Sequence, residues 1–295
     1  MRIGIIGGSG IGEQLVSAMS SVGEVRRHEV ETPFGAPSDA VLTGAWRSSS
    51  GETVDLALLS RHGDGHRYPP HRVPYRANIW AMKTLGVTHI IATCAVGSLC
   101  EDVRPGDVVL CDQVLDRTDG RTRTFFDDAA VHVEFADPVC GVMRQWLLDA
   151  GKGAETTVHA AGTYVTIEGP SFSTRAEAAM HRAMGAHVVG MTAMPEARLA
   201  REAQIGYAIV ALPTDDDCWR PRAVADEASL LREIRSNLER ASAAALTLIR
   251  KGLDDVTTLK ATPSMAHRSL AYAVWSSDDA LTDETRARLD VLRGN

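Results

Sequence analysis

The amino-acid sequence predicts a single α/β domain whose sheet is mainly buried. Short apolar runs alternate with segments of helical period, and most runs are continuously apolar instead of alternating with polar residues. No linker, repeat or low-complexity tract divides the chain, and 295 residues, 44% of them hydrophobic, are enough to bury a large core. We expect strands at Ile3–Ile6, Val54–Leu59, His89–Thr93, Asp107–Cys111, Tyr164–Ile167, His187–Met191 and Tyr207–Leu212.

Several segments between and after these strands have the marks of helices. Tyr75–Leu85 is followed by Gly86, a common residue just past a helix C-terminus. A second helix is expected at Ser173–Met184 with its serine as N-terminal cap, and a third at Pro195–Gln204, where proline fits the first turn. A long helix at about Asp226–Lys251 carries one apolar stripe, which we assign to the core. The stripe consists of Leu230, Ile234, Leu238, Ala241, Ala245 and Leu248.

Composition and charge exclude several classes of protein. The net charge is −7 without a basic block, so no nucleic-acid footprint is present, and no apolar run approaches the roughly 20 residues that span a membrane. The five cysteines form no C-x-x-C pair or zinc-spaced cluster, which predicts reduced thiols in a cytoplasmic enzyme without a metal. We expect residues 1–256 to form the main domain and 257–295 a C-terminal appendage, helical at Leu281–Leu292.

An acidic motif, Thr214-Asp215-Asp216-Asp217-Cys218-Trp219, directly follows the last apolar run. Its carboxylates are therefore expected at the carboxyl end of a buried strand, where α/β proteins bind ligands. A carboxylate there accepts a hydrogen bond from an exocyclic amine, and a carboxylic acid donates a proton to a ring nitrogen. The competing interpretation is a solvated acidic loop.

Two motifs after early strands suit an anion. Gly7-Gly8-Ser9-Gly10-Ile11-Gly12 offers backbone N–H groups and a hydroxyl to an anion. It lacks the G-x-G-x-x-G spacing of a dinucleotide site, so the two interpretations left open are an oxyanion-binding loop and a plain tight turn. Arg61-His62-Gly63 adds a planar guanidinium fork and a second donor. The same tripeptide occurs in histidine phosphatases, though on the first strand of those chains.

Further polar groups end other strands. Thr93-Cys94-Ala95 and Gly190-Met191-Thr192 offer hydroxyls and backbone amides that can complete an anion site. Phe172, before the second predicted helix, supplies a ring that can stack on a base. Each strand-end signal alone is more typical of an ordinary strand-to-loop transition, and a lone Phe is more often part of a core.

Together the motifs resemble one family, the 5'-methylthioadenosine phosphorylases of the trimeric purine nucleoside phosphorylase superfamily. The similarity covers about three quarters of the chain. It runs through the glycine loop, Glu31-Thr32-Pro33-Phe34-Gly35, Tyr75-Arg76-Ala77-Asn78-Ile79-Trp80-Ala81, Pro105-Gly106-Asp107, Thr166-Ile167-Glu168-Gly169-Pro170, Met191-Thr192-Ala193-Met194-Pro195-Glu196 and the acidic motif. The resemblance implies a central twisted mixed β-sheet flanked by helices (the nucleoside phosphorylase fold) and a homotrimer with active sites near subunit interfaces.

The resemblance also assigns residue roles. Phosphate binding falls to Ser9, Arg61, His62, Cys94, Ala95 and Thr192, and nucleoside binding to Met191, Phe172, Ser173, Asp215, Asp217 and His132, the last from the neighbouring subunit. Asp217 would protonate the purine at N7 and Asp215 would contact the 6-amino group. Two departures stand out: Ser9 replaces a common Thr, and Cys94 replaces a Thr, so that a weaker thiol donor faces phosphate.

The implied reaction is phosphorolysis of 5'-methylthioadenosine to adenine and 5-methylthioribose 1-phosphate, with phosphate as co-substrate and no cofactor. The alternatives are a phosphorylase of 5'-methylthioinosine or of a 5'-halo-5'-deoxyadenosine. Two alternatives belong to other functional classes. One is a histidine phosphatase with His62 as nucleophile, and the other is a protein that binds nucleosides without turnover.

Overall fold

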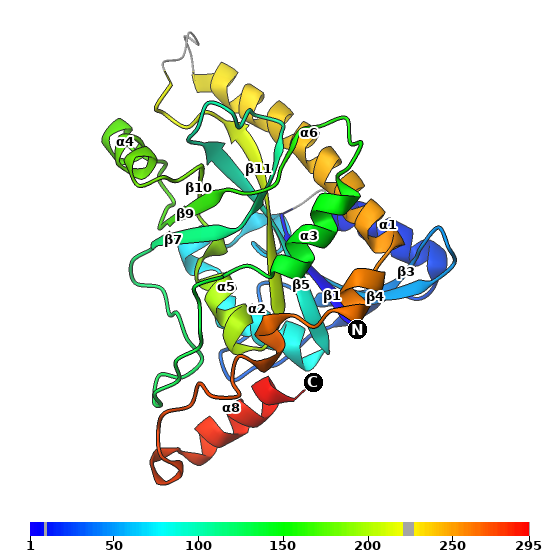
Figure 1. Cartoon of the computed structure of the whole chain (residues 1–295), viewed down its shortest axis with the longest axis vertical. Helices are drawn as coiled ribbons and strands as arrows, with labels where there is room; N and C mark the ends of the chain where they lie inside the picture. Colours follow the sequence, from blue (N-terminus) through cyan, green and yellow to red (C-terminus); the bar gives the residue numbers. More distant parts are fainter. Residues whose placement is uncertain (9–10, 221–226, 295) are drawn as a thin grey trace.

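The computed structural model describes residues 1–8, 11–220 and 227–294, and within them the strands form one mixed sheet (Figure 1). The strands are β1 Arg2–Gly7, β2 Arg26–His28, β3 Val41–Arg47, β4 Thr53–Ser60, β5 Val87–Ser98, β6 Val108–Cys111, β7 Gln113–Arg117, β8 Val158–His159, β9 Thr163–Ile167, β10 Val188–Gly190 and β11 Gly206–Asp215. The helices are α1 Ile11–Val22, α2 Tyr75–Thr84, α3 Gly141–Ala150, α4 Arg175–Ala183, α5 Ala193–Glu202, α6 Glu227–Asp254, α7 Thr257–Ala261 and α8 Asp283–Arg293.

Strand β5 is the centre of the sheet and the place where it divides. Along one edge, β5 pairs in parallel with β1 as far as Ala92, and antiparallel with β10 at Gly97 and Ser98. Along the other edge it pairs in parallel with β11. The carboxyl ends of β1, β5 and β11 therefore converge beside the stretch Thr93–Val96, in the position that open α/β sheets use for ligands.

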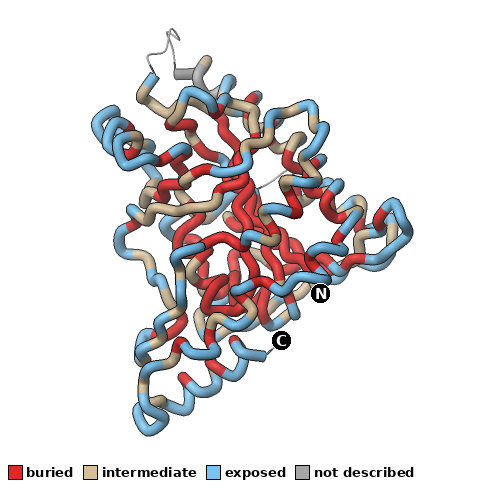
Figure 2. Tube along the Cα trace, in the orientation of Figure 1, coloured by how far each residue is buried: buried red, intermediate tan, exposed pale blue. Residues whose placement is uncertain are grey.

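Helices cover both faces of the sheet (Figure 1), so the core is divided into two main layers. Side chains of α2, α5 and α8 join one layer, and those of α1, α3 and α6 join the other. Figure 2 shows the central strands as the buried part of the trace. A third, small cluster lies under α4 and contains Leu99, Val165, Ala178, Ala186 and Val189.

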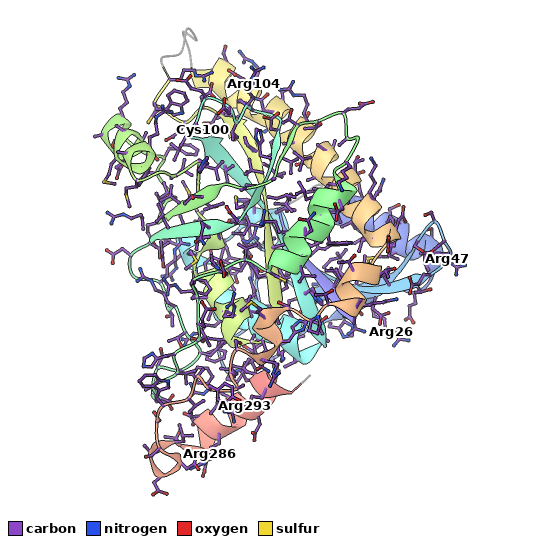
Figure 3. All side chains as sticks on the ribbon, in the orientation of Figure 1. Arg26, Arg47, Cys100, Arg104, Arg286 and Arg293 are labelled. Atoms are coloured by element: carbon purple, nitrogen blue, oxygen red, sulfur yellow. The ribbon has the colours of Figure 1, made fainter. Side chains whose placement is uncertain are left out.

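The labelled arginines of β2, β3 and α8 lie toward the edges of the molecule (Figure 3). In Figure 3, Arg26 and Arg47 lie at the end of the sheet that carries β3, whereas Arg286 and Arg293 lie along α8. None of the described helices has both the length and the apolar character needed to cross a membrane.

The fold class and each predicted strand position are confirmed, because every apolar run coincides with a strand. Strands β2, β3, β7 and β8 were not predicted. The cap of α4 is a correction: Thr174, not Ser173, accepts from the backbone N–H of Glu177 and completes a capping box with its carboxylate. The predicted third helix begins two residues before Pro195, although Met194 within it has extended backbone angles.

The residues after 256 pack against the main body. Leu270, Ala273, Leu289 and Leu292 are buried in the same core layer as α2. The predicted C-terminal helix corresponds to α8. The division of the chain at residue 256 stays a prediction.

The buried histidine beneath this segment gives the protein an expected sensitivity to acid. The ring of His89 is 2% exposed and meets the ring of His267 edge-on at 4.9 Å. Burial, together with the charges of His267 and the N-terminus, lowers the pKa of His89 to about 4. The unfolded chain takes up this proton below about pH 6.5, so stability present above that pH is lost as the pH falls toward 4.

Replacing His89 by Gln should flatten the dependence of unfolding free energy on pH between about 6.5 and 4. The lowered pKa of His89 corresponds to at most about 3 kcal/mol of unfolding free energy, at about 1.36 kcal/mol per pKa unit. Urea titrations at several pH values measure it, with the exposed His71→Gln as control. An unchanged slope in the His89 variant would contradict the assignment.

Candidate active site

A cavity of about 430 Å³ opens where β5, β10 and β11 meet. Of the residues predicted for binding or catalysis, it is lined by Arg61, His62, Cys94, Ala95, Phe172, Ser173, Met191, Thr192, Asp215 and Asp217. Gly8 also lines it, whereas Ser9 lies outside the described residues. Residues from distant parts of the sequence thus share one space.

Arg61 follows β4 and its guanidinium is locked in place. Its side chain is 2% exposed, and Nε and Nη2 each donate to the carboxylate of Glu196 at 2.8 Å. Nη1 donates to the carbonyl of Thr93 at 2.8 Å and Nη2 also to that of Ile6 at 3.3 Å. The predicted fork therefore binds Glu196, and among the described residues the four bonds use four of the five guanidinium N–H groups. Although burial opposes the charge, Glu196 keeps the pKa of Arg61 above its usual value.

His62 lines the cavity, and one of its two ring nitrogens is already bound within the protein. Its Nδ1 lies 2.8 Å from the carbonyl oxygen of Tyr68, so Nδ1 carries the proton and Nε2 holds a lone pair in the neutral ring. Burial and the neighbouring Arg61 lower the pKa of His62 to about 4.

Cys94 and Thr192 form the wall beside Arg61. The hydroxyl of Thr192 donates to the sulfur of Cys94 at 3.4 Å, and both residues are buried. Burial raises the pKa of the Cys94 thiol, which is therefore neutral near pH 7. This part of the wall thus consists of a hydroxyl and a neutral thiol, neither of which carries a negative charge near pH 7.

Two residues of the acidic motif, Asp215 and Asp217, line the cavity beside Gly97 of β5. Asp215 accepts from the hydroxyl of Thr214 at 2.9 Å and from the backbone N–H of Asp217 at 2.7 Å. Asp217 has a left-handed backbone with φ of 46°. A Cβ at Gly97 would lie 3.2 Å from the Cβ of Asp217 and 3.4 Å from a carboxylate oxygen of Asp215, so glycine permits both acids to pack on β5.

Helix α6 supplies residues that the sequence analysis missed. Ile234, Leu238 and Ser242 line the cavity, so part of the stripe assigned to the core faces the site. Ala241, Ala245 and Leu248 are buried in the core as predicted, while the Leu230 side chain lies outside the described residues. Helical period alone does not distinguish the two environments, because a cavity wall is as apolar as a core.

His132 does not line the cavity of its own chain. Its ring meets that of Trp275 edge-on at 5.4 Å, and its backbone N–H donates to the carbonyl of Ala273. Its contact with a nucleoside in a neighbouring subunit stays a prediction.

Comparisons with known proteins agree on one family. The family model described as the phosphorylase superfamily matches residues 2–252. Two relatives are S-methyl-5'-thioadenosine phosphorylases, from Geobacter sulfurreducens (44% identical, covering 99% of this chain and 98% of the relative) and Danio rerio (42%, covering 92% and 96%).

Solved structures give the same picture. A methylthioadenosine phosphorylase from an antarctic soil metagenomic library aligns with a TM-score of 0.84 at 43% identity, covering 98% of each chain. A variant of the Schistosoma mansoni adenosine/methylthioadenosine phosphorylase in complex with methylthioadenosine aligns with a TM-score of 0.78 at 36% identity, covering 93% of this chain and 99% of the other.

Proposed function

Because the chain belongs to the phosphorylase superfamily and, within it, to the 5'-methylthioadenosine phosphorylases, we propose that it cleaves 5'-methylthioadenosine with phosphate. The products are adenine and 5-methylthioribose 1-phosphate. As an enzyme, the chain is of the purine nucleoside phosphorylase type. One observation carries the choice of substrate: a single cavity is lined both by Arg61 and Thr192, the proposed phosphate ligands, and by the two acids Asp215 and Asp217.

The proposed reaction moves charge between the two ends of this cavity. A phosphate oxygen attacks C1' as the bond from C1' to N9 breaks, and the electron pair of that bond passes to the purine. Asp217 delivers a proton to N7, so adenine leaves neutral. The anionic phosphate, held beside Arg61 and Thr192, stabilises the cationic sugar before bonding to it.

His62 extends the phosphate end of this scheme. With its proton held on Nδ1 by the Tyr68 carbonyl, Nε2 accepts a hydrogen bond from a protonated phosphate oxygen. The remaining N–H of Arg61 then binds an unprotonated oxygen. The site thereby orients phosphate through one acceptor and several donors.

Asp215 selects the base. Its carboxylate, fixed by the Thr214 hydroxyl and the Asp217 N–H, accepts from the 6-amino group of adenine. A 6-oxo base places a carbonyl oxygen opposite this carboxylate, so that two acceptors face each other without a proton between them. Leaving buried polar groups unpaired costs binding energy, so the site should strongly favour adenine over a 6-oxopurine.

The decisive test is release of adenine from 5'-methylthioadenosine with and without phosphate, with 5'-methylthioinosine and adenosine in parallel. We expect phosphate-dependent release from the first and little turnover of the inosine analogue. Rapid turnover of that analogue would contradict the role of Asp215. Binding without turnover would favour the nucleoside-binding alternative.

We also propose a homotrimer in which the neighbour supplies His132. The exposed aromatic residues beside His132 support an interface there: Trp275 is 74% exposed and Tyr272 90% exposed. Light scattering on the full chain measures the assembly, and a monomer at full activity would exclude it.

Replacing Cys94 by Ser should strengthen phosphate binding. The change keeps the size of the side chain and exchanges a weak thiol donor for a hydroxyl, worth about 1 kcal/mol or fivefold in the KM for phosphate. The matched control is Cys111→Ser, a buried cysteine that does not line the cavity. A KM that rises or stays constant in the Cys94 variant would show that phosphate relies on the backbone there.

A further inference from the structure

Trp219 lies two residues after Asp217 and ties the acidic motif to the sheet. Its indole Nε1 donates to the carbonyl of Ser98 at 2.8 Å. Ser98 is the residue after Gly97, against which Asp217 packs. The acidic loop is thus attached to the end of β5 at two consecutive residues. Asp217 packs against Gly97, and Trp219 donates to Ser98.

Arg182 on α4 completes the attachment from the other side. Its guanidinium carbon lies 3.6 Å from the centre of the Trp219 ring, a close cation–π contact, and its Nη1 donates to the carbonyl of Leu99. The carbonyl of Ser98 therefore accepts a hydrogen bond from Trp219, and the carbonyl of Leu99 accepts one from Arg182. The two donors also stack on each other.

This arrangement lies outside the two main core layers. Trp219 and Cys218 pack only partly buried against the small cluster under α4. The thiol of Cys218 donates to the carbonyl of Ser173 at 3.3 Å, next to Phe172 on the cavity wall. Because few apolar contacts support the loop, its directional contacts to β5 and α4 have a large share in fixing its conformation.

We propose that Trp219, held by Arg182, is a positioning residue that sets the carboxyl group of Asp217 against the purine. The inference rests on the proposed function, because it concerns the group assigned to protonate N7. Asp217 has a left-handed backbone, a conformation that is uncommon for residues other than glycine although Asp adopts it more readily than most. Its own N–H donates to the Asp215 carboxylate, and the Trp219–Ser98 bond, two residues further along, constrains the chain that follows. Neither Trp219 nor Arg182 lines the cavity, so both act through Asp217.

The test uses two substrates that differ in their need for an acid. Adenine must gain a proton at N7 to leave readily, whereas N7-methylated 5'-methylthioadenosine already carries a positive base and releases neutral 7-methyladenine without one. Replacing Trp219 by Phe keeps a ring for Arg182 but removes the N–H donor. We expect kcat for 5'-methylthioadenosine to fall about tenfold and kcat for the methylated substrate to change less than about twofold. The KM for phosphate should stay within about twofold of the parent value, since Arg61 and Thr192 are untouched.

Three further variants make the result specific. Arg182→Gln should reproduce the substrate-selective loss from a different element, which covers the case of a poorly folded Trp219 variant. Trp46→Phe removes an indole donor at the far end of the sheet, where it bonds to Asp254 at 3.4 Å, and should change neither rate. Asp217→Asn serves as the reference for complete loss of the acid.

The outcomes separate the inference from the proposed function. Equal losses on both substrates in the Trp219 and Arg182 variants, or no loss on either, would overturn the positioning role. If Asp217→Asn shows the selective loss and the Trp219 variant does not, only the positioning inference fails. If the parent enzyme releases no adenine from 5'-methylthioadenosine with phosphate, the proposed function itself fails.

Discussion

Replacing Asp217 by Asn is expected to lower kcat for phosphorolysis of 5'-methylthioadenosine by about 10²–10⁴-fold, the usual contribution of a positioned general acid. The amide keeps the size of the side chain and can still hydrogen-bond to the purine, but it cannot deliver a proton to N7. The KM for phosphate should change little, because Arg61 and Thr192, the residues proposed to bind phosphate, are untouched. Steady-state rates of adenine release at saturating phosphate measure the effect.

Asp216 provides the matched control, since it adjoins Asp217 but does not line the cavity. Its carboxylate lies 3.4 Å from the guanidinium of Arg220, in a partly exposed pair. Asp216→Asn should leave kcat within about twofold, as expected for the loss of a weak surface pair. Similar activity in the parent and the Asp217 variant would remove Asp217 from the mechanism and leave Asp215 as the remaining candidate acid in the motif.

The strand-end position of these acids was predictable because two strong signals coincide. The run from Tyr207 to Leu212 is long enough and apolar enough to specify a buried strand, and polar residues immediately after such a strand reach the ligand-binding edge of the sheet. The same logic placed Arg61, Cys94 and Thr192 in one cavity. Local pattern and sheet geometry were sufficient for this part of the site.

Two of the four strands that escaped prediction, β2 and β8, lack that local signal. Strand β2 is Arg26-Arg27-His28, whose side chains are exposed or half-buried, and β8 has two residues. Their pairing depends on β3 and β6, which already belong to the sheet. Tertiary context, and not propensity, determines such edge strands.

Hydrogen-bond roles were also beyond the sequence. Arg61 and His62 were both expected to donate to an anion, yet Glu196 and two backbone carbonyls accept four hydrogen bonds from the Arg61 guanidinium, and the Tyr68 carbonyl lies beside Nδ1 of His62. Glu196 lies 135 residues from Arg61, so no local pattern connects them. Charge alone does not tell whether a cation binds ligand directly or is held by a partner in the fold.

Glu196, the buried partner of Arg61, is the site of the second substitution with a large expected effect. Replacing Glu196 by Gln is expected to destabilise the protein by about 3–5 kcal/mol, because it leaves the buried Arg61 guanidinium without a counter-charge. Both side chains are at most 2% exposed, so water cannot compensate. Tyr207 makes the loss larger, since its hydroxyl donates to Glu196 at 2.9 Å. Urea denaturation of the purified variant measures the change.

A double-mutant cycle separates this pair from general damage to the core. Arg61→Gln with Glu196→Gln removes both charges, and its loss of stability should be smaller than the sum of the single losses by about 2 kcal/mol or more. Glu29→Gln removes the partner of Arg27 in a pair whose side chains are 60% and 76% exposed, and should cost less than about 0.5 kcal/mol. Additive losses in the buried pair would mean that packing, and not charge compensation, retains Glu196. With a large coupling energy, Glu196 is instead the group that allows the Arg61 cation to be kept in the wall of the cavity before any anion binds.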